Sequence, residues 1–227
     1  MTQVSAGSAQ AVIGFLHGRD VDAEFCKSLL ALTHHSRDRI GTVLTVNSGA
    51  NVSGPRNELA ARFVLERREP WLLLVDTDMV FAPDALDRLL AAADRKARPI
   101  VGGLCFSQGN DGPLSTMYEL VPHADGAGTF ARRQTWPEDA LVEVSATGAA
   151  FLLVHRYVLE HIANRGWGNP RKRDPVCPWF RESTMGTRLM GEDLTFCVRA
   201  RSAGYPVFVH TGIQIGHMKS QMLGKAL

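Results

Sequence analysis

The sequence predicts an α/β fold, a single domain with a central, mostly parallel β-sheet flanked by helices. Between residues 11 and 106, apolar runs of strand length alternate with segments whose apolar residues recur at helical spacing. Repeated strand–helix units of this kind form parallel sheets covered by helices. The 227 residues suit one domain, and the hydrophobic content of 45% can fill a sizeable core.

The first half of the chain carries the clearest elements. Strands are predicted at 11–16, 40–46, 71–75 and 100–106. A helix follows the first strand because Phe25, Leu29 and Leu32 share one face. A second helix begins at Pro55 or Arg56 and ends before Pro70, and a third is opened by Pro83.

The second half is less regular and predicts a small second sheet. Strands are predicted at 115–121, 141–144, 149–154, 207–210 and 213–216, and helices at 157–162 and 192–203. Residues 167–180 contain three prolines, which predicts a long loop that could act as a lid. We expect the domain to span 11–219, with a flexible N-terminal tail at 1–10 and a C-terminal tail at 220–227.

Composition and charge exclude several classes of protein. The formal net charge of +2 argues against a dedicated nucleic-acid binder. The four cysteines show no CxxC spacing, which argues against a zinc knuckle and fits a reducing, cytoplasmic setting. The first ten residues lack the basic start and apolar core of a signal peptide, and no apolar run is long enough to span a membrane. We therefore expect a cytoplasmic protein without integral membrane contact.

Two carboxylates, Asp76 and Asp78, end the apolar run at 71–75. The carboxyl ends of parallel strands border the crevice in which open α/β sheets bind ligands. Such a pair suits a divalent cation that holds a phosphate. The pattern alone is weak because it recurs at Asp20 and Asp22, which precede a helix and are interpreted as an exposed cap. The alternative for Asp76 and Asp78 is a solvated strand end.

Three further sets of polar residues stand at positions suited to catalysis or ligand binding. Glu192 and Asp193 begin a predicted helix, either as acids favoured by the helix dipole or as a general base and acceptor-binding pair. His217 follows a short strand and could be a metal ligand or a structural histidine. Arg56 and Asn57, at a helix start, could hold phosphate, orient the carboxylates of the acidic pair or form an ordinary cap.

Together these segments resemble the GT-A (Rossmann-like) glycosyltransferases, particularly the family-2-like bacterial and phage enzymes with DxD and ED motifs. The resemblance extends from Val12 to about Lys219. Its matching segments, in order, are AVIGFLHGRD, PRNELAARFVLE, WLLLVDTDMVFAPDALDRLL, PIVGGLCF, ATGAAFLLVHRYVLEHI, GEDLTFCVRARSAGYPVFV and IGHMKS.

The resemblance implies a role for each matching residue. Asp78, with Asp76 and His217, would bind Mn²⁺ or Mg²⁺ on the donor diphosphate, and Asp193, paired with Glu192, would be the general base of an inverting enzyme. The nucleotide sugar would contact His17, Gly18, Arg19, Arg56, Asn57, Asp76 and Thr77. The sugar or acceptor side would be lined by Thr147 and Gly148. Trp179 and Phe180 could stack on a sugar there or pack in the core.

The sequence thus predicts a metal-dependent glycosyltransferase that uses a nucleotide sugar, most simply a UDP-sugar. The first strand lacks the proline-rich turn of many family-2 members, and a QxxRW motif is missing, which argues against a processive synthase. The alternatives are a nucleotidyltransferase acting on a nucleoside triphosphate and a non-enzymatic glycan-binding module. The acceptor (protein, glycan, lipid or modified nucleic acid), the stereochemical outcome and the oligomeric state stay open, and a phage-encoded enzyme would work in the host cytoplasm.

Overall fold

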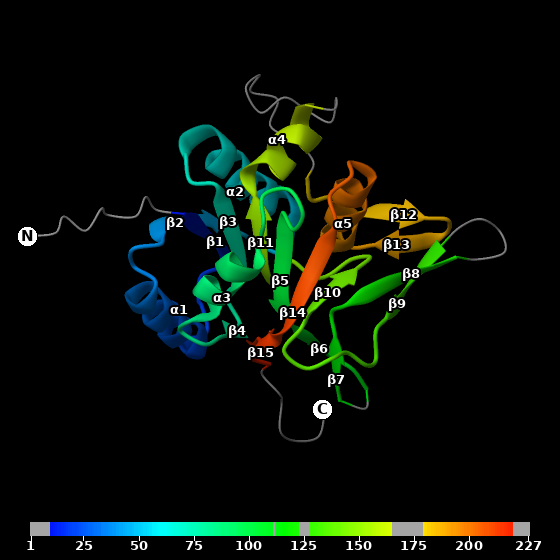
Figure 1. Cartoon of the computed structure of the whole chain (residues 1–227), viewed down its shortest axis with the longest axis horizontal. Coiled ribbons are helices and arrows are strands. Elements are labelled where there is room, and N and C mark those ends of the chain that lie inside the picture. Colours follow the sequence, from blue (N-terminus) through cyan, green and yellow to red (C-terminus); the bar gives the residue numbers. More distant parts are fainter. Residues whose placement is uncertain (1–9, 111, 123–127, 165–178, 220–227) are drawn as a thin grey trace, which may run out of the picture.

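A seven-stranded sheet forms the centre of the molecule (Figure 1). The computed structural model describes residues 10–110, 112–122, 128–164 and 179–219. The strand order is β10-β14-β5-β11-β3-β1-β2. In chain order these strands are β1 (Ala11–His17), β2 (Ile40–Asn47), β3 (Trp71–Asp76), β5 (Ile100–Leu104), β10 (Leu141–Val144), β11 (Phe151–His155) and β14 (Val207–Gln214).

The sheet is mixed, with most of its strands running one way. Strand β1 pairs in parallel with β2 and β3, and β5 pairs in parallel with β14. Strand β11 lies antiparallel between β3 and β5, and β10 runs antiparallel along β14. Consequently β1, β2, β3, β5 and β14 share one direction, which confirms the predicted α/β class with a mostly parallel sheet.

Helices cover both faces of this sheet. They are α1 (Ala23–His35), α2 (Ser53–Glu66), α3 (Ala85–Ala92), α4 (Arg156–Asn164) and α5 (Glu192–Ser202). Apolar residues of α2, α4 and α5 form one core with one face of the strands, and those of α1 and α3 form a second core with the other. Successive residues of a strand point to opposite faces, so Leu72 and Leu73 belong to different cores.

Four short strand pairs, among the described residues, replace the single small second sheet that the sequence predicts. They are β4 (Met79–Val80) with β15 (Gly216–His217), β6 (Phe106–Gln108) with β7 (Pro113–Ser115), β8 (Tyr118–Pro122) with β9 (Gly128–Arg132), and β12 (Ser183–Met185) with β13 (Arg188–Met190). The predicted strand at 207–210 and the first half of the one at 213–216 form the single strand β14, which carries a register shift between His210 and Gln214, while Gly216 belongs to β15.

Some predicted features fall outside the described residues. These are the tails at 1–9 and 220–227 and most of the predicted lid, since 165–178 are not described. Within the parts of the chain that are described, no helix is long and apolar enough to cross a membrane.

Candidate active site

The Asp76–Asp78 turn lies at the carboxyl end of β3, in the middle of the sheet. The Asp76 N–H donates to the Ala150 carbonyl at 2.9 Å. The Asp22 N–H donates to the Thr77 carbonyl at 3.2 Å, and the Met218 N–H donates to the Asp78 carbonyl at 2.8 Å. Segments from both ends of the chain therefore fix the backbone of this turn and the direction of its carboxylates.

Asp78 and His217 are in contact, although 139 positions separate them (217 − 78 = 139). The pairing of β15 with β4 sets His217 opposite Met79, next to Asp78. His217 Nε2 lies 2.8 Å from Asp78 Oδ2, and His217 Nδ1 donates to the Phe106 carbonyl at 2.7 Å. A backbone carbonyl on Nδ1 fixes the ring and aims Nε2, the arrangement typical of metal-binding histidines.

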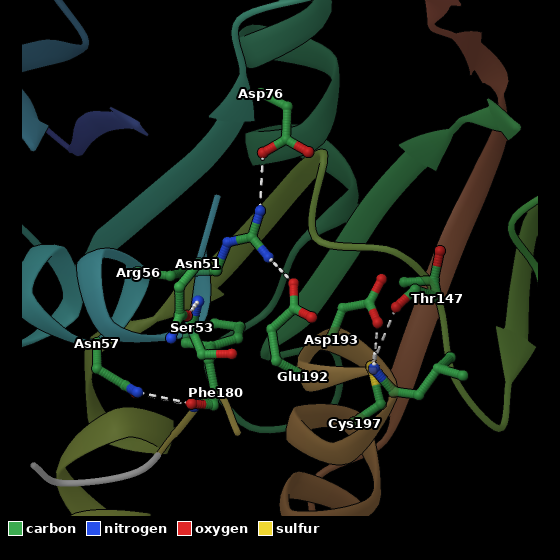
Figure 2. Close-up of polar contacts among 11 residues, drawn as sticks. Asn51, Ser53, Arg56, Asn57, Asp76, Thr147, Phe180, Glu192, Asp193 and Cys197 are labelled. Carbon is green, nitrogen blue, oxygen red and sulfur yellow. Dashed lines mark hydrogen bonds and ion pairs between the residues drawn. The ribbon is translucent and has the colours of Figure 1, made fainter. Parts of the chain in front are cut away.

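Asp76 pairs with Arg56 (Figure 2). The Arg56 guanidinium donates to Asp76 Oδ1 at 2.8 Å and to Glu192 Oε1 at 2.5 Å. Its side chain is only 6% exposed. Arg56 therefore links the end of β3 to the first turn of α5, and a guanidinium is suited to this because its fork carries several donors in a fixed plane.

The acids around Arg56 also govern its charge. Burial lowers the pKa of Arg56, but Asp76, Glu192 and Asp193 together outweigh that effect and raise the pKa above its ordinary value. Arg56 is therefore a permanent positive charge between the two acidic motifs. It neutralises charge on Asp76 and Glu192, which sit on either side of it in Figure 2.

Asp193 is in a different environment from Glu192. Burial and the neighbouring charge of Glu192 raise the pKa of Asp193, although the Leu194 N–H and Arg56 oppose that shift. Its Oδ2 would lie 3.5 Å from a β-carbon placed on Gly148, so the glycine leaves the carboxylate uncovered on that side. A carboxylate with a raised pKa is suited to accept a proton.

A cavity of about 420 Å³ opens beside the acidic turn. Its lining residues are Leu16, Gly18, Asp20, Val21, Asp22, Ser48, Val52, Asp76, Thr77 and Asp78. Its volume is within the range of small-molecule and cofactor pockets. Asp20 and Asp22 thus line the same cavity as Asp76 and Asp78. As predicted, Asp22 caps α1, where its carboxylate accepts from the Glu24 N–H.

The residues predicted to contact the nucleotide at the end of β1 are partly in place. Gly18 and Thr77 line the cavity. His17 hydrogen-bonds to the neighbouring Gly18 carbonyl at 2.9 Å, and Arg19 is exposed outside the cavity lining. Gly18, Asp76 and Thr77 are thus the three predicted nucleotide-contacting residues that line the cavity.

Three predicted site residues have structural contacts instead. Both ends of the Asn57 amide bind the Phe180 backbone, with Nδ2 2.6 Å from the carbonyl and Oδ1 2.9 Å from the N–H. Trp179 and Phe180 are 0% exposed. The Trp179 indole donates to the Leu159 carbonyl, and Phe180 stacks on Phe196. Stacking of either ring on a sugar is therefore wrong for this structure, and core packing, the alternative, holds.

Thr147 also faces inward. It is 1% exposed, and its carbonyl accepts from the buried Cys197 thiol at 3.5 Å. Burial raises the pKa of Cys197 to about 12, so the thiol stays protonated and keeps this bond. Of the predicted Thr147 and Gly148 pair, Gly148 is the one that reaches the site, beside Asp193 and Thr116.

Comparison with known proteins identifies the fold. No protein-family model and no curated protein matches the sequence. Among solved structures, A197 from STIV matches with a TM-score of 0.59 and 16% identity over 93% of this chain and 86% of that one. GalNAc-T7, solved with UDP, GalNAc and Mn²⁺, matches with a TM-score of 0.56 and 9% identity over 93% of this chain. The chain spans 44% of the length of GalNAc-T7.

The protein has a GT-A-like fold. At these identities the likeness shows the fold alone, and it confirms that part of the sequence prediction. The acidic turn of this GT-A-like fold stands at the carboxyl end of β3, where ligands bind in open α/β sheets.

The residues at the turn fit part of a metal site. Asp78 Oδ2 and His217 Nε2 converge, while Asp76 is held by Arg56. Within the described ranges, no group of three His, Cys, Asp or Glu side chains surrounds one point. One carboxylate and one imidazole suit a cation that takes its remaining ligands from water or from a bound diphosphate. The predicted convergence of Asp78 and His217 agrees with the structure, and the metal itself stays a prediction.

Sequence analysis missed three contributors to the site. Asp20 and Asp22 were interpreted only as a cap, although a cap that follows β1 necessarily lies at the ligand-binding edge of the sheet. Lys219 was not singled out, yet its Nζ lies 3.0 Å from Asp78 Oδ2. The sequence does indicate this position, because Lys219 follows the predicted metal ligand His217 by two residues.

Proposed function

We propose that the protein is a metal-dependent glycosyltransferase that moves a sugar from a nucleotide-diphosphate sugar, a UDP-sugar, to an acceptor. The observation that carries the proposal is the contact of Asp78 with His217 at the edge of the acid-lined cavity. Arg56 links Asp76, in the same turn as Asp78, to Glu192, the neighbour of Asp193, so a donor-binding side and a proton-accepting side are connected through one arginine.

The donor side follows from the chemistry of its residues. Asp78 and His217 would hold a divalent cation which, when bound, neutralises the negative charge that develops on the diphosphate leaving group. An imidazole beside a carboxylate favours Mn²⁺ over Mg²⁺. The cavity next to them would receive the nucleoside, with Gly18 and Thr77 in its wall. GalNAc-T7, which shares the fold and was solved with UDP, GalNAc and Mn²⁺, supports this donor class.

The acceptor side centres on Asp193. Its raised pKa makes the carboxylate a stronger base than an exposed Asp, and the missing side chain of Gly148 leaves its Oδ2 uncovered on that side. In an inverting reaction, Asp193 would take the acceptor proton, a contribution of roughly 10²–10⁴ in rate. Glu192 is paired with Arg56, so its part is to position Arg56 and the first turn of α5.

A thermal-shift screen of nucleotide sugars with and without Mn²⁺ tests the donor and the metal together. We expect a UDP-sugar to raise the melting temperature only when Mn²⁺ is present, because Asp78 and His217 alone make an incomplete ligand set. Asp78→Ala should abolish turnover, while Asp38→Ala, which removes an exposed carboxylate far from the turn, should leave turnover intact. Unchanged donor turnover in Asp78→Ala would rule out the metal assignment.

The same assays separate the two alternatives. A nucleotidyltransferase would release pyrophosphate from a nucleoside triphosphate. A glycan-binding module would bind glycan without metal and without hydrolysing a nucleotide sugar. Either result, in place of Mn²⁺-dependent donor turnover, contradicts the proposal.

A further inference from the structure

Lys219 occupies the side of Asp78 that a metal ion would need. Its Nζ lies 3.0 Å from Asp78 Oδ2, the same oxygen that His217 Nε2 approaches at 2.8 Å. The Met218 N–H binds the Asp78 carbonyl, which anchors the chain directly before Lys219. The backbone next to Lys219 is therefore held beside Asp78.

An ammonium and a divalent cation compete for this oxygen. A cation bound to a carboxylate lies about 2.0–2.2 Å from its oxygen, well inside the 3.0 Å of the Lys219 contact. Two positive charges within a few ångströms of one another repel strongly near a protein surface. When the metal binds, the Lys219 ammonium must leave Asp78. The diphosphate that arrives with the metal then offers the ammonium a new negative partner.

The structure also gives Lys219 room to move. Its side chain is 51% exposed, and with His217 it lines a separate cavity of about 230 Å³ formed by Phe106, Ser107, Gln108 and Pro113. Arg56, by contrast, is 6% exposed and fixed between two carboxylates. Asp76 is thus neutralised by an immobile cation and Asp78 by one that can be released.

We propose that Lys219 is the resident cation of the donor site and couples metal binding to nucleotide binding. In the ligand-free protein it neutralises Asp78 and opposes binding of the metal alone. With a nucleoside diphosphate present, Lys219 transfers to a phosphate oxygen and Asp78 becomes free for the metal. The inference rests on the proposed function, and it assigns Lys219 a role that His217 and Asp78 do not fill.

Mn²⁺ affinity measured without catalysis tests this coupling. Electron paramagnetic resonance of free Mn²⁺ gives its dissociation constant with and without UDP, for the wild type, Lys219→Met and Lys219→Arg. In the wild type, UDP should tighten Mn²⁺ binding by at least about tenfold. Lys219→Met should bind Mn²⁺ alone about tenfold more tightly than the wild type, and UDP should then have much less effect. Lys219→Arg, which keeps the charge, should retain the coupling.

The controls separate the inference from the function on which it rests. Lys96→Met removes an exposed lysine away from the turn and should match the wild type. Equal Mn²⁺ affinity of the wild type and Lys219→Met, with Mn²⁺-dependent UDP binding intact, overturns the inference alone. Absence of Mn²⁺–UDP binding by the wild type overturns the proposed function and this inference with it. Because Lys219 is half exposed, melting temperatures of all variants should agree, which verifies that they fold.

Discussion

At the scale of single residues, Arg56 is the side chain on which the candidate site most depends. Arg56→Met would leave Asp76 and the largely buried Glu192 facing each other without a counter-charge. Removing one partner of a buried ion pair is strongly destabilising, and because Asp76 is partly exposed we expect a loss of about 3 kcal/mol in the free energy of unfolding. Urea unfolding measures it. Arg37→Met, at a highly exposed arginine, should change stability by less than about 0.5 kcal/mol.

Asp193 is the proposed general base. Asp193→Asn should lower kcat by roughly 10²–10⁴ while the dissociation constant of UDP with Mn²⁺ stays unchanged, because the residue acts on the acceptor. The wild-type rate should fall on the acid side at a pH above the 3.8 of an ordinary Asp carboxyl, since burial and Glu192 raise the Asp193 pKa. Arg56 opposes that shift, so Arg56→Met should move the acid limb still higher. An acid limb that moves downward in Arg56→Met would contradict the assignment.

The sequence could single out Asp78, His217 and Asp193 as candidates because each stands at or near the end of an element. A strand end or a first helical turn can be recognised from local periodicity alone, and its side chains project into the crevice. The sequence allowed Arg56 to orient the acidic pair, but it could not show that Arg56 also binds Glu192 or that Asn57 binds Phe180. Arg56 lies 20 residues from Asp76 and 136 from Glu192, and such contacts are decided by how whole elements pack.

At the scale of elements, Asn57 attaches α2 to the segment that precedes β12. Asn57→Ala leaves the buried N–H and carbonyl of Phe180 without partners, and each such group costs about 1–3 kcal/mol. We expect a loss of about 2–4 kcal/mol by urea unfolding, with UDP affinity unchanged. Asn51→Ala removes an exposed amide that accepts from the Ser53 N–H and should cost less than about 1 kcal/mol. A selective loss of UDP affinity in Asn57→Ala would restore the original nucleotide-binding assignment.

The short strand pairs mark the limit of element-level prediction. Strands of the central sheet are apolar and longer, so their periodicity is visible in the sequence. Pairs such as β8 and β9 contain mixed, half-exposed residues, and their pairing depends on neighbours elsewhere in the fold. The antiparallel insertion of β11 between β3 and β5 is also invisible locally, because Phe151–His155 is fully buried and would look the same in either direction.

At the scale of the whole molecule, the two ends of the sheet have different roles. The carboxyl ends of β1 and β3 carry the acidic turn and the cavity. The opposite edge, at the amino ends of these strands, carries His155, the last residue of the antiparallel β11. His155 is 8% exposed, and its ring makes a T-shaped contact with the ring of Trp71. This edge contains none of the candidate site residues, so it can be altered to test stability without changing the donor site.

His155 should make the stability of the protein depend on pH. Burial, together with Arg95 and Arg156, lowers the pKa of His155 from 6.5 to about 4, and burial and Arg88 lower that of His210 in the same direction. The unfolded chain binds a proton at His155 near pH 6.5, whereas the folded chain does not until about pH 4, so the free energy of unfolding falls as pH decreases between these values.

We expect His155 to account for roughly 1–2 kcal/mol of the difference in unfolding free energy between pH 7 and pH 4.5. Urea unfolding at the two pH values should show a smaller difference for His155→Leu than for the wild type, because Leu cannot take up a proton. His34→Leu, at an exposed histidine, should keep the wild-type difference. If His155→Leu and the wild type show the same pH dependence, His155 is not its cause. The dependence would then be assigned to His210, whose pKa is also lowered.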